Sequence, residues 1–335
     1  MEQKLHPFAK FIAILARGKT KTRAFTLEES REAMELILNG TALPEQIGAF
    51  LMLLRLKEET PEEIAGFTLG ARATFDLPEA LPQIDIDWSS YAGKRRQLPW
   101  FILSVLLLSQ NGVRVLMHGT GGHTPGRMYT RETLQKLGFP IARSYDAAAR
   151  DIAVRNFAYL PLEVMSPKLR ELIEMRPLFG LRSPVHSFSR MLNPFNAPVM
   201  MQGIFHRGFM DIHAGAGLLL EQPCTTVFRG EGGEIERRPN KPTLVWNGKD
   251  GDISEEQWPA LLSDGHAAAD ENMDINHLVA VWRGTLDDAY ASASVTGTLA
   301  IALKSLGHSD TTAGAQKLAQ SMWDTRDKDS LPVAP

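Results

Sequence analysis

The sequence has a single cysteine, Cys224, among its 335 residues, so no disulfide can form within the chain. A lone cysteine is typical of proteins in a reducing compartment. Long hydrophobic runs are also missing. The longest, WFILSVLLLS at 100–109, has half of the roughly 20 residues that a membrane-spanning helix needs. The N-terminal segment lacks the extended apolar core of a secretory signal. We therefore expect a cytoplasmic protein with no membrane partner.

Charge is modest in total: charged residues make up 22% of the chain, and the formal net charge is −3. This total hides a segregation along the sequence. Residues 94–182 hold fourteen Lys or Arg against six acids, whereas residues 250–290 hold one against ten. A basic region beside an acidic one predicts a dipolar surface that attracts an anionic partner. Scattered, solvated charge is the alternative interpretation.

The first 75 residues predict helices. Thr26 and Glu29 have the spacing of a capping box before TLEESREAMELILNG ends at Gly40. Thr60 and Pro61 begin another helix, which has two glutamates in its first turn. The segment EQIGAFLMLLRLK between them has the composition of a buried helix. Together these segments predict an all-helical unit.

The pattern changes after the proline-bearing linker LPEALPQIDIDW. Short apolar strands then alternate with helices, which predicts a wound, mainly parallel sheet. The expected strands are 84–88, 113–117, 198–205, 225–228 and 243–246, and the expected helices are 99–112, 129–137, 146–154, 166–182, 209–221 and 286–323. We predict an α/β protein with a small helical domain at 1–77, which a helical segment near 166–190 rejoins, and a larger α/β domain at 78–335.

Two stretches carry a family resemblance. They are TLEESREAMELILNGTALPEQIGAFLMLLRLKEETPEEIAGFTLGAR at 26–72 and MRPLFGLRSPVHSFSRMLNPFNAP at 175–198. The first resembles the helical subdomain of anthranilate phosphoribosyltransferases of glycosyltransferase family 3. The second resembles their acceptor-site stretch and retains Arg176 and Arg182. The resemblance implies a nucleoside phosphorylase/phosphoribosyltransferase-like fold and a homodimer formed through the helical domain.

The resemblance also implies a glycine-rich loop, Gly-Thr-Gly-Gly-Asp, that holds the pyrophosphate of phosphoribosyl pyrophosphate. This sequence departs from it. The corresponding loop, SSYAGKRRQLPW at 89–100, keeps only Gly93 of the glycines. Lys94, Arg95 and Arg96 stand in place of the tight turn. Cations there preserve affinity for phosphate but lose the close backbone approach that glycine permits.

Two further catalytic elements of the family are altered. In the second loop, His118 and Gly119 match the family's Lys-His-Gly-Asn, while Thr120 replaces its asparagine. In the pair that binds magnesium in the family, Glu234 takes the place of the aspartate and Ile235 that of the glutamate. We therefore expect these catalytic positions to be degenerate, the protein to lack phosphoribosyl transfer to anthranilate, and no cofactor or metal to be needed.

Anion binding is nevertheless expected. The loop HGTGGHTPGR at 118–127 precedes a helix, so its free backbone N–H groups favour an anion. A glycine-rich turn without a ligand is the alternative. The residues expected to bind phosphate or nucleic acid are Lys94, Arg95, Arg96, His118, Gly119, Thr120, Arg127, Arg131, Arg176 and Arg182.

These departures resemble a YbiB-like branch of the family, whose members bind nucleic acid. The resemblance implies sequence-tolerant binding of nucleic acid, with DNA as the expected partner, through contacts between cations and backbone phosphates. Tyr91, Trp100 and Tyr129 are candidates for stacking on bases, and core packing is the alternative for Trp100. Two alternatives stay open. One is an active phosphoribosyltransferase with an altered acceptor and magnesium held by Glu234 and water. The other is a module that senses a small phosphate ligand.

Overall fold

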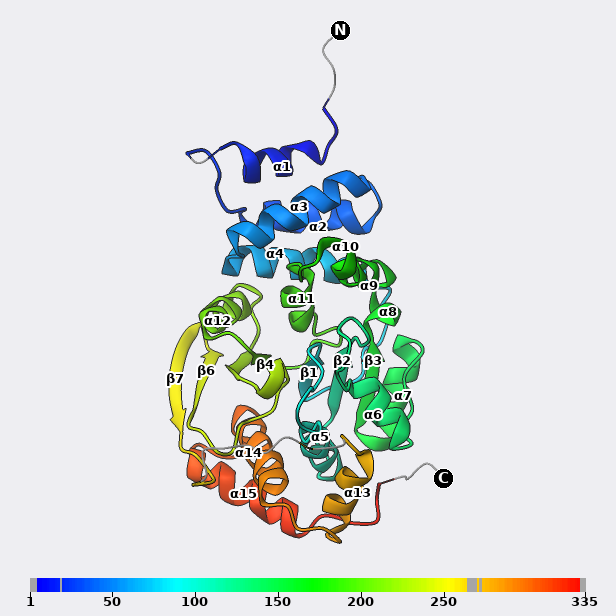
Figure 1. Ribbon diagram of the computed structural model, residues 1–335, viewed down its shortest axis with the longest axis vertical. Helices are drawn as coiled ribbons and strands as arrows, with labels where there is room; N and C mark the ends of the chain where they lie inside the picture. The colour runs from blue at the N-terminus through cyan, green and yellow to red at the C-terminus, as the bar shows by residue number, and fades with distance from the viewer. Residues whose placement is uncertain (1–4, 19, 264–269, 271–272, 332–335) are drawn as a thin grey trace.

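The computed structural model describes residues 5–18, 20–263, 270 and 273–331. A bundle of N-terminal helices lies at one end of a larger α/β body (Figure 1). The body contains a seven-stranded sheet in the order β3-β2-β1-β4-β5-β6-β7. Its strands are β1 Ile86–Ser90, β2 Val115–Gly119, β3 Phe157–Pro161, β4 Val199–Ile204, β5 Cys224–Arg229, β6 Thr243–Lys249 and β7 Asp252–Trp258. The first five strands pair in parallel, and β6 and β7 add an antiparallel edge. The predicted fold class is confirmed.

Four helices precede the linker in the described part of the chain. They are α1 Ala9–Ala16, α2 Leu27–Leu38, α3 Pro44–Lys57 and α4 Pro61–Arg72. Before α2, the Thr26 hydroxyl accepts from the Glu29 amide at 3.2 Å, and the Glu29 carboxylate accepts from the Thr26 amide at 3.0 Å. Thr60 and Glu63 form the same reciprocal pair before α4. Two otherwise unpaired N–H groups are thus satisfied at each start.

Glycine allows α2 and α4 to pack closely. A Cβ atom added at Gly66 would lie 2.3 Å from the carbonyl oxygen of Leu27, and one added at Gly70 would lie 2.6 Å from that of Arg31. Because the two glycines are four residues apart, both lie on one face of α4. This face brings the backbones of the two helices into contact.

A returning segment packs under the bundle. It contains α8 Leu162–Met165, α9 Pro167–Glu174, α10 Arg176–Phe179, α11 Val185–Phe188 and the short 3-10 turn η1 Ser189–Met191. From α4, the Arg72 guanidinium donates to the carbonyls of Leu192 and Met191 at 2.9 and 2.8 Å. Figure 1 shows α9, α10 and α11 next to the N-terminal helices. The exact domain limits stay a prediction.

The sheet separates two apolar cores because side chains of a strand alternate between its faces. Val115 and Met117 of β2 pack into one core with α5 Phe101–Gln110 and α14 Ala289–Ser305, whereas Leu116 between them faces the other core. The remaining helical elements are α6 Thr130–Lys136, α7 Tyr145–Arg155, α12 Met210–Leu219, α13 Ile275–Arg283 and α15 Thr312–Asp324, with the 3-10 turns η2 Arg207–Phe209 and η3 Glu231–Gly233.

Two strands were not predicted. β3 follows α7 directly after the left-handed Asn156 and is fully buried, while β7 is a polar, mostly exposed edge strand that lacks an apolar alternation. Within the described ranges, no helix has both the length and the apolar character required to cross a membrane.

Candidate active site

The candidate site lies where the winding of the sheet reverses. The chain runs from β1 to β2 and β3 on one side, then returns to place β4 and β5 on the other side of β1. In open parallel sheets, ligands bind outside the carboxyl ends of the strands at such a point. The loops that follow β1, β2 and β5 meet here through hydrogen bonds of Glu234 and Arg127 described below. The Gly230 amide also donates to the carbonyl of Ile204, the last residue of β4.

In the first loop, a carboxylate of the protein occupies two backbone donors. The amides of Ala92 and Gly93 donate to Oε1 of Glu234 at 2.7 and 2.6 Å. Gly93 has a φ of 70°, a left-handed conformation that favours glycine and turns both amides toward one point. Two convergent N–H groups form an anion-binding concavity. The anion found there is Glu234 itself, which is fully buried.

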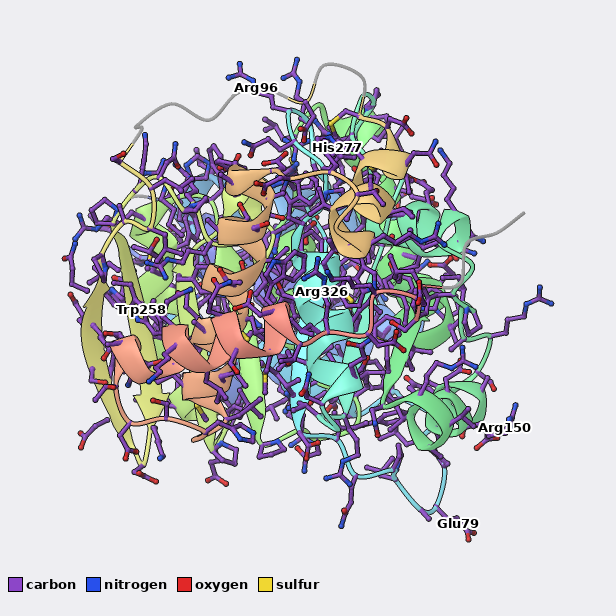
Figure 2. All side chains as sticks on the ribbon, turned by 90° about the horizontal axis from the view of Figure 1, so that it is seen from below. Glu79, Arg96, Arg150, Trp258, His277 and Arg326 are labelled. Carbon is purple, nitrogen blue, oxygen red and sulfur yellow. The ribbon has the colours of Figure 1, made fainter. Side chains whose placement is uncertain are left out.

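The three cations after Gly93 have different environments. Lys94 is 2% exposed and forms a salt bridge with Glu236, whose other oxygen accepts from the Phe101 amide at 2.9 Å. Burial raises the pKa of the Glu236 carboxyl to about 7, although Lys94 opposes this shift. Arg95 and Arg96 are exposed, and Figure 2 shows Arg96 at the periphery, directed outward. The expected row of three surface cations is therefore reduced to two.

The second loop begins inside the sheet. His118 is fully buried: its Nε2 lies 3.2 Å from Oδ2 of Asp87, and its Nδ1 lies 2.9 Å from the Tyr91 hydroxyl. The His118 side chain therefore holds Tyr91 of the first loop from inside the protein and is not exposed to solvent. Gly119 ends β2 against the Ser90 carbonyl, which lies 1.9 Å from the position of an added Cβ.

Arginine side chains hold the rest of the second loop. Arg127 donates to the carbonyls of Ala92 and Gly93 at 2.9 and 3.0 Å, so it ties the second loop to the first. Arg176 donates to the carbonyl of His123 at 2.8 Å. Arg170 contacts the Thr120 hydroxyl and donates to the Gly121 carbonyl at 2.8 Å. The sequence interpretation missed Arg170.

Arg131 lies apart from these loop contacts and pairs with Glu163 of α8. Of the predicted phosphate ligands on the second loop and its helix, Arg127 and Arg131 are thus both bound to protein groups. Their contact with phosphate stays a prediction.

Arg182 differs from the other predicted cations. Within the described parts of the chain, no hydrogen bond or ion pair satisfies its half-buried guanidinium. Burial lowers the pKa of Arg182 to about 10, and the positive charges of three neighbouring arginines act in the same direction. These neighbours are Arg127, Arg190 and Arg176. A concentration of like charge in a partly buried place favours the binding of an anion.

A cavity of about 150 Å³ opens beside Arg182, between the end of α3, α11 and the carboxyl end of β4. Its lining includes three side chains that the sequence interpretation did not select for the site: Glu59, His186 and Arg190. Burial raises the pKa of the Glu59 carboxyl, whose Oε2 lacks a partner among the described residues. The signal for Arg190 was its place in the acceptor-site stretch, eight residues after Arg182.

The residues present do not fit a magnesium ion held by the protein. Magnesium requires oxygen ligands in octahedral order and is usually bound through one or two carboxylates. Oε1 of Glu234 already accepts two amides, and Ile235, at the second position of the pair, is buried in the apolar core. In the residues that the structure describes, no cluster of three or more His, Cys, Asp or Glu could hold a metal.

Comparison with known proteins shows what this chain is similar to. Residues 9–74 match the family described as "Glycosyl transferase family, helical bundle domain". Over 317 residues, the chain is 27% identical to an anthranilate phosphoribosyltransferase of Moorella thermoacetica, a match that covers 89% of both proteins. The chain is anthranilate phosphoribosyltransferase-like. An uncharacterized protein of Aquifex aeolicus is 29% identical over 232 residues, 69% of this chain and 71% of that protein.

Solved structures agree with the fold of this phosphoribosyltransferase-like chain. The anthranilate phosphoribosyltransferase of Thermus thermophilus superposes with a TM-score of 0.76 at 19% identity and covers 95% of this chain and 94% of its own. The enzyme of Saccharomyces cerevisiae, in complex with phosphoribosyl pyrophosphate and magnesium, superposes with a TM-score of 0.76 at 15% identity, covering 95% and 93%.

These relatives correct the functional hypothesis drawn from the sequence. The prediction of a nucleic-acid-binding protein is wrong, because similarity over 89% of the chain leads to phosphoribosyltransferases. The rings proposed to stack on bases, Tyr91, Trp100 and Tyr129, are buried and serve packing. The relatives are transferases and do not support the prediction of an inactive protein. They also leave the narrower YbiB-like resemblance unconfirmed.

Proposed function

We propose that this protein is a phosphoribosyltransferase that transfers the ribose phosphate of phosphoribosyl pyrophosphate to a small anionic acceptor. The observation that carries the proposal is the guanidinium of Arg182, which lies among three other arginines without a partner in the described chain. A relative that matches 89% of the chain is a phosphoribosyltransferase by name.

The acceptor is assigned to the cavity beside Arg182. Arg182 and Arg190 supply positive charge, and the aromatic rings of Phe205 and Phe209 supply flat apolar surface. This combination suits a small planar carboxylate, since a guanidinium binds a carboxylate in a fixed geometry while the rings cover its apolar face. Anthranilate is the reference compound of this class, named in the relatives.

The donor is assigned to the first loop. The amides of Ala92 and Gly93 now hold the Glu234 carboxylate, and a pyrophosphate oxygen has the same charge sign and acceptor chemistry. Binding of the donor there requires Glu234 to leave the two amides. No step is assigned to magnesium, because the described residues do not fit it.

In the reaction, a lone pair of the acceptor forms a bond to C1 of the ribose while the bond from C1 to the pyrophosphate oxygen breaks. Pyrophosphate leaves with that electron pair, and the acceptor loses a proton. Positive charge near the leaving group lowers the barrier by stabilising the developing anion. Glu59 is the candidate proton acceptor, since it is a buried carboxyl with a raised pKa on the wall of the same cavity.

The test measures pyrophosphate release with phosphoribosyl pyrophosphate and a panel of aromatic amino acids and aminobenzoates that includes anthranilate. We expect acceptor-dependent release, and a loss of about 10–100-fold in kcat/KM for Arg182→Gln, because a hydrogen bond to a charged group contributes roughly 1.5–3 kcal/mol. The matched control is Arg114→Gln. Arg114 pairs with Asp85 at the amino ends of β1 and β2, whereas the candidate site lies at their carboxyl ends.

A second readout separates a binding role of Arg182 from a structural one. Because its neighbours are also arginines, Arg182→Gln relieves repulsion and should raise the melting temperature of the ligand-free protein while it lowers activity. A fall in both would assign Arg182 to structure. Absence of donor binding in calorimetry, together with no pyrophosphate release from any acceptor, would overturn the proposed function.

A further inference from the structure

A second cavity lies far from the candidate active site, at the end of the molecule opposite the helical bundle. Its volume is about 700 Å³, and α14, α15 and the end of β7 form its walls. Figure 1 shows these elements at the bottom of the molecule, and Figure 2, seen from below, labels Trp258 beside α15. Cavities of 300–1,000 Å³ are typical of sites for small organic ligands.

The buried base of this cavity is an arginine with incomplete contacts. Arg237 is 1% exposed. Its Nη2 contacts the carbonyl of Pro259, its Nη1 lies 3.4 Å from Oε1 of Gln316, and its guanidinium lies 5.2 Å from the centre of the Trp258 ring. Its Nε–H is buried without a partner. Within the described ranges, no carboxylate pairs with this charge.

Arg326 shows what a satisfied arginine looks like in the same half of the molecule. It also stacks on an aromatic ring, at 3.6 Å from the centre of Trp323. All three of its nitrogens donate to carbonyls, those of Trp282, Trp323 and Val281. In Arg237, by contrast, the Nε–H has no partner and the contact of Nη1 with Gln316 is long, at 3.4 Å. Burial lowers the pKa of Arg237 to about 10.

The walls above Arg237 are apolar or neutral. Trp258, Leu261 and Ala293 provide apolar surface, and Lys317 adds an exposed cation. None of the lining residues in the described chain is an acid. An unpaired buried charge costs free energy unless a partner neutralises it. The cavity therefore combines a need for one negative charge with room for an apolar body.

We propose that this cavity is a binding site for a small amphipathic carboxylate, with the carboxylate at Arg237 and the apolar body between α14 and α15. The site is separate from the one that would bind the donor and acceptor, since it shares no lining residue with the cavity beside Arg182. The proposal therefore holds whether or not the protein transfers ribose phosphate.

The test compares octanoate with 1-octanol, which has the same chain length and no charge. Binding to the full-length protein is measured at pH 7 by calorimetry and by the shift of the Trp258 indole resonance, assigned with Trp258→Phe. We expect octanoate to bind at least tenfold more tightly than octanol. The variant Arg237→Met should abolish this preference, whereas Arg326→Met should keep it.

A filling variant keeps the test decisive if Arg237→Met fails to fold. Ala293 lies half-buried on α14 at the wall of the cavity, so Ala293→Phe retains Arg237 and occupies the volume. It should weaken octanoate binding at least tenfold. Equal affinity for octanoate and octanol, no binding of octanoate, or octanoate binding unchanged in Ala293→Phe would each overturn the proposal.

Discussion

Gly93 and Glu234 are 141 positions apart in the chain, and the Gly93 amide donates to Oε1 of Glu234 over 2.6 Å. The Ala92 amide donates to the same oxygen. A carboxylate thus occupies the place to which we assign an oxygen of the pyrophosphate. Under the proposed function, donor binding and displacement of Glu234 are one competitive equilibrium.

The first prediction tests this competition. Glu234→Gln removes the negative charge from the side chain that holds the two amides, so phosphoribosyl pyrophosphate should bind about tenfold more tightly, given roughly 1.5–3 kcal/mol for a hydrogen bond to a charged group. Calorimetry measures the affinity. The control is Glu231→Gln, three positions earlier, whose carboxylate pairs with Arg238 instead. Weaker donor binding in Glu234→Gln would mean that this carboxylate helps to hold the donor.

The second prediction concerns the buried pair Lys94–Glu236. Lys94→Met leaves the Glu236 carboxylate buried without its counter-charge, which should lower the free energy of unfolding by roughly 3–5 kcal/mol. The double variant Lys94→Met/Glu236→Gln removes both charges and should recover most of that loss. Urea denaturation at pH 8 measures both. Equal destabilisation of the single and double variants would contradict the pairing.

The third prediction is a pH dependence. The pKa of Glu236 rises from 4.5 to about 7 in the folded protein because the carboxyl is buried. Between these values the folded state holds a proton that the unfolded state has lost, so the free energy of unfolding falls as the pH rises. The protonated Glu236 carboxyl contributes about 3 kcal/mol to the free energy of unfolding. This contribution is complete below pH 4.5 and lost above pH 7. Glu236→Gln should flatten the stability profile between pH 5 and 8. Parallel profiles for the two proteins would refute this assignment.

The fourth prediction uses two helical glycines of the bundle. At Gly66 an added Cβ would lie 2.3 Å from the Leu27 carbonyl, whereas at Gly48 it would meet only the Phe179 ring, at 3.8 Å. Gly66→Ala should therefore destabilise the protein by roughly 1–3 kcal/mol through overpacking. Gly48→Ala should stabilise it by up to about 1 kcal/mol through helix propensity. Thermal denaturation decides, and the same sign for both variants would refute the close packing of α2 and α4.

The fifth prediction is a homodimer through the helical domain, as the family resemblance implies. Leu56, at the end of α3, is 84% exposed. If it lies in the dimer interface, Leu56→Glu should weaken association at least tenfold in sedimentation experiments, because burying an unpaired charge is costly. Val154→Glu is the control, since Val154 is 77% exposed on α7 of the α/β body. A monomeric parent protein at micromolar concentration would refute the prediction.

Local signals in the sequence determined where several elements begin. The capping boxes at Thr26 and Thr60 are hydrogen bonds between residues three positions apart, so the chain specifies them without tertiary contacts. The alternation of short apolar strands with helices was enough for the fold class, because parallel strands need helical crossovers. The sequence did not predict β7, because this strand has no apolar alternation and forms only through its pairing with β6.

Only the tertiary structure decided which charges are available to a ligand. In the sequence, Lys94, Arg95 and Arg96 are three equivalent consecutive cations. In the folded protein only Lys94 of the three is buried, where it pairs with Glu236, 142 positions away. Glu234 likewise reaches the amides of Ala92 and Gly93 only because β1 and β5 both flank β4. Arg182 and Arg237 are ordinary arginines until the fold buries them and supplies no acid among the described residues. Such differences arise from desolvation and long-range pairing, which depend on the packed neighbours of a side chain and not on its place in the sequence.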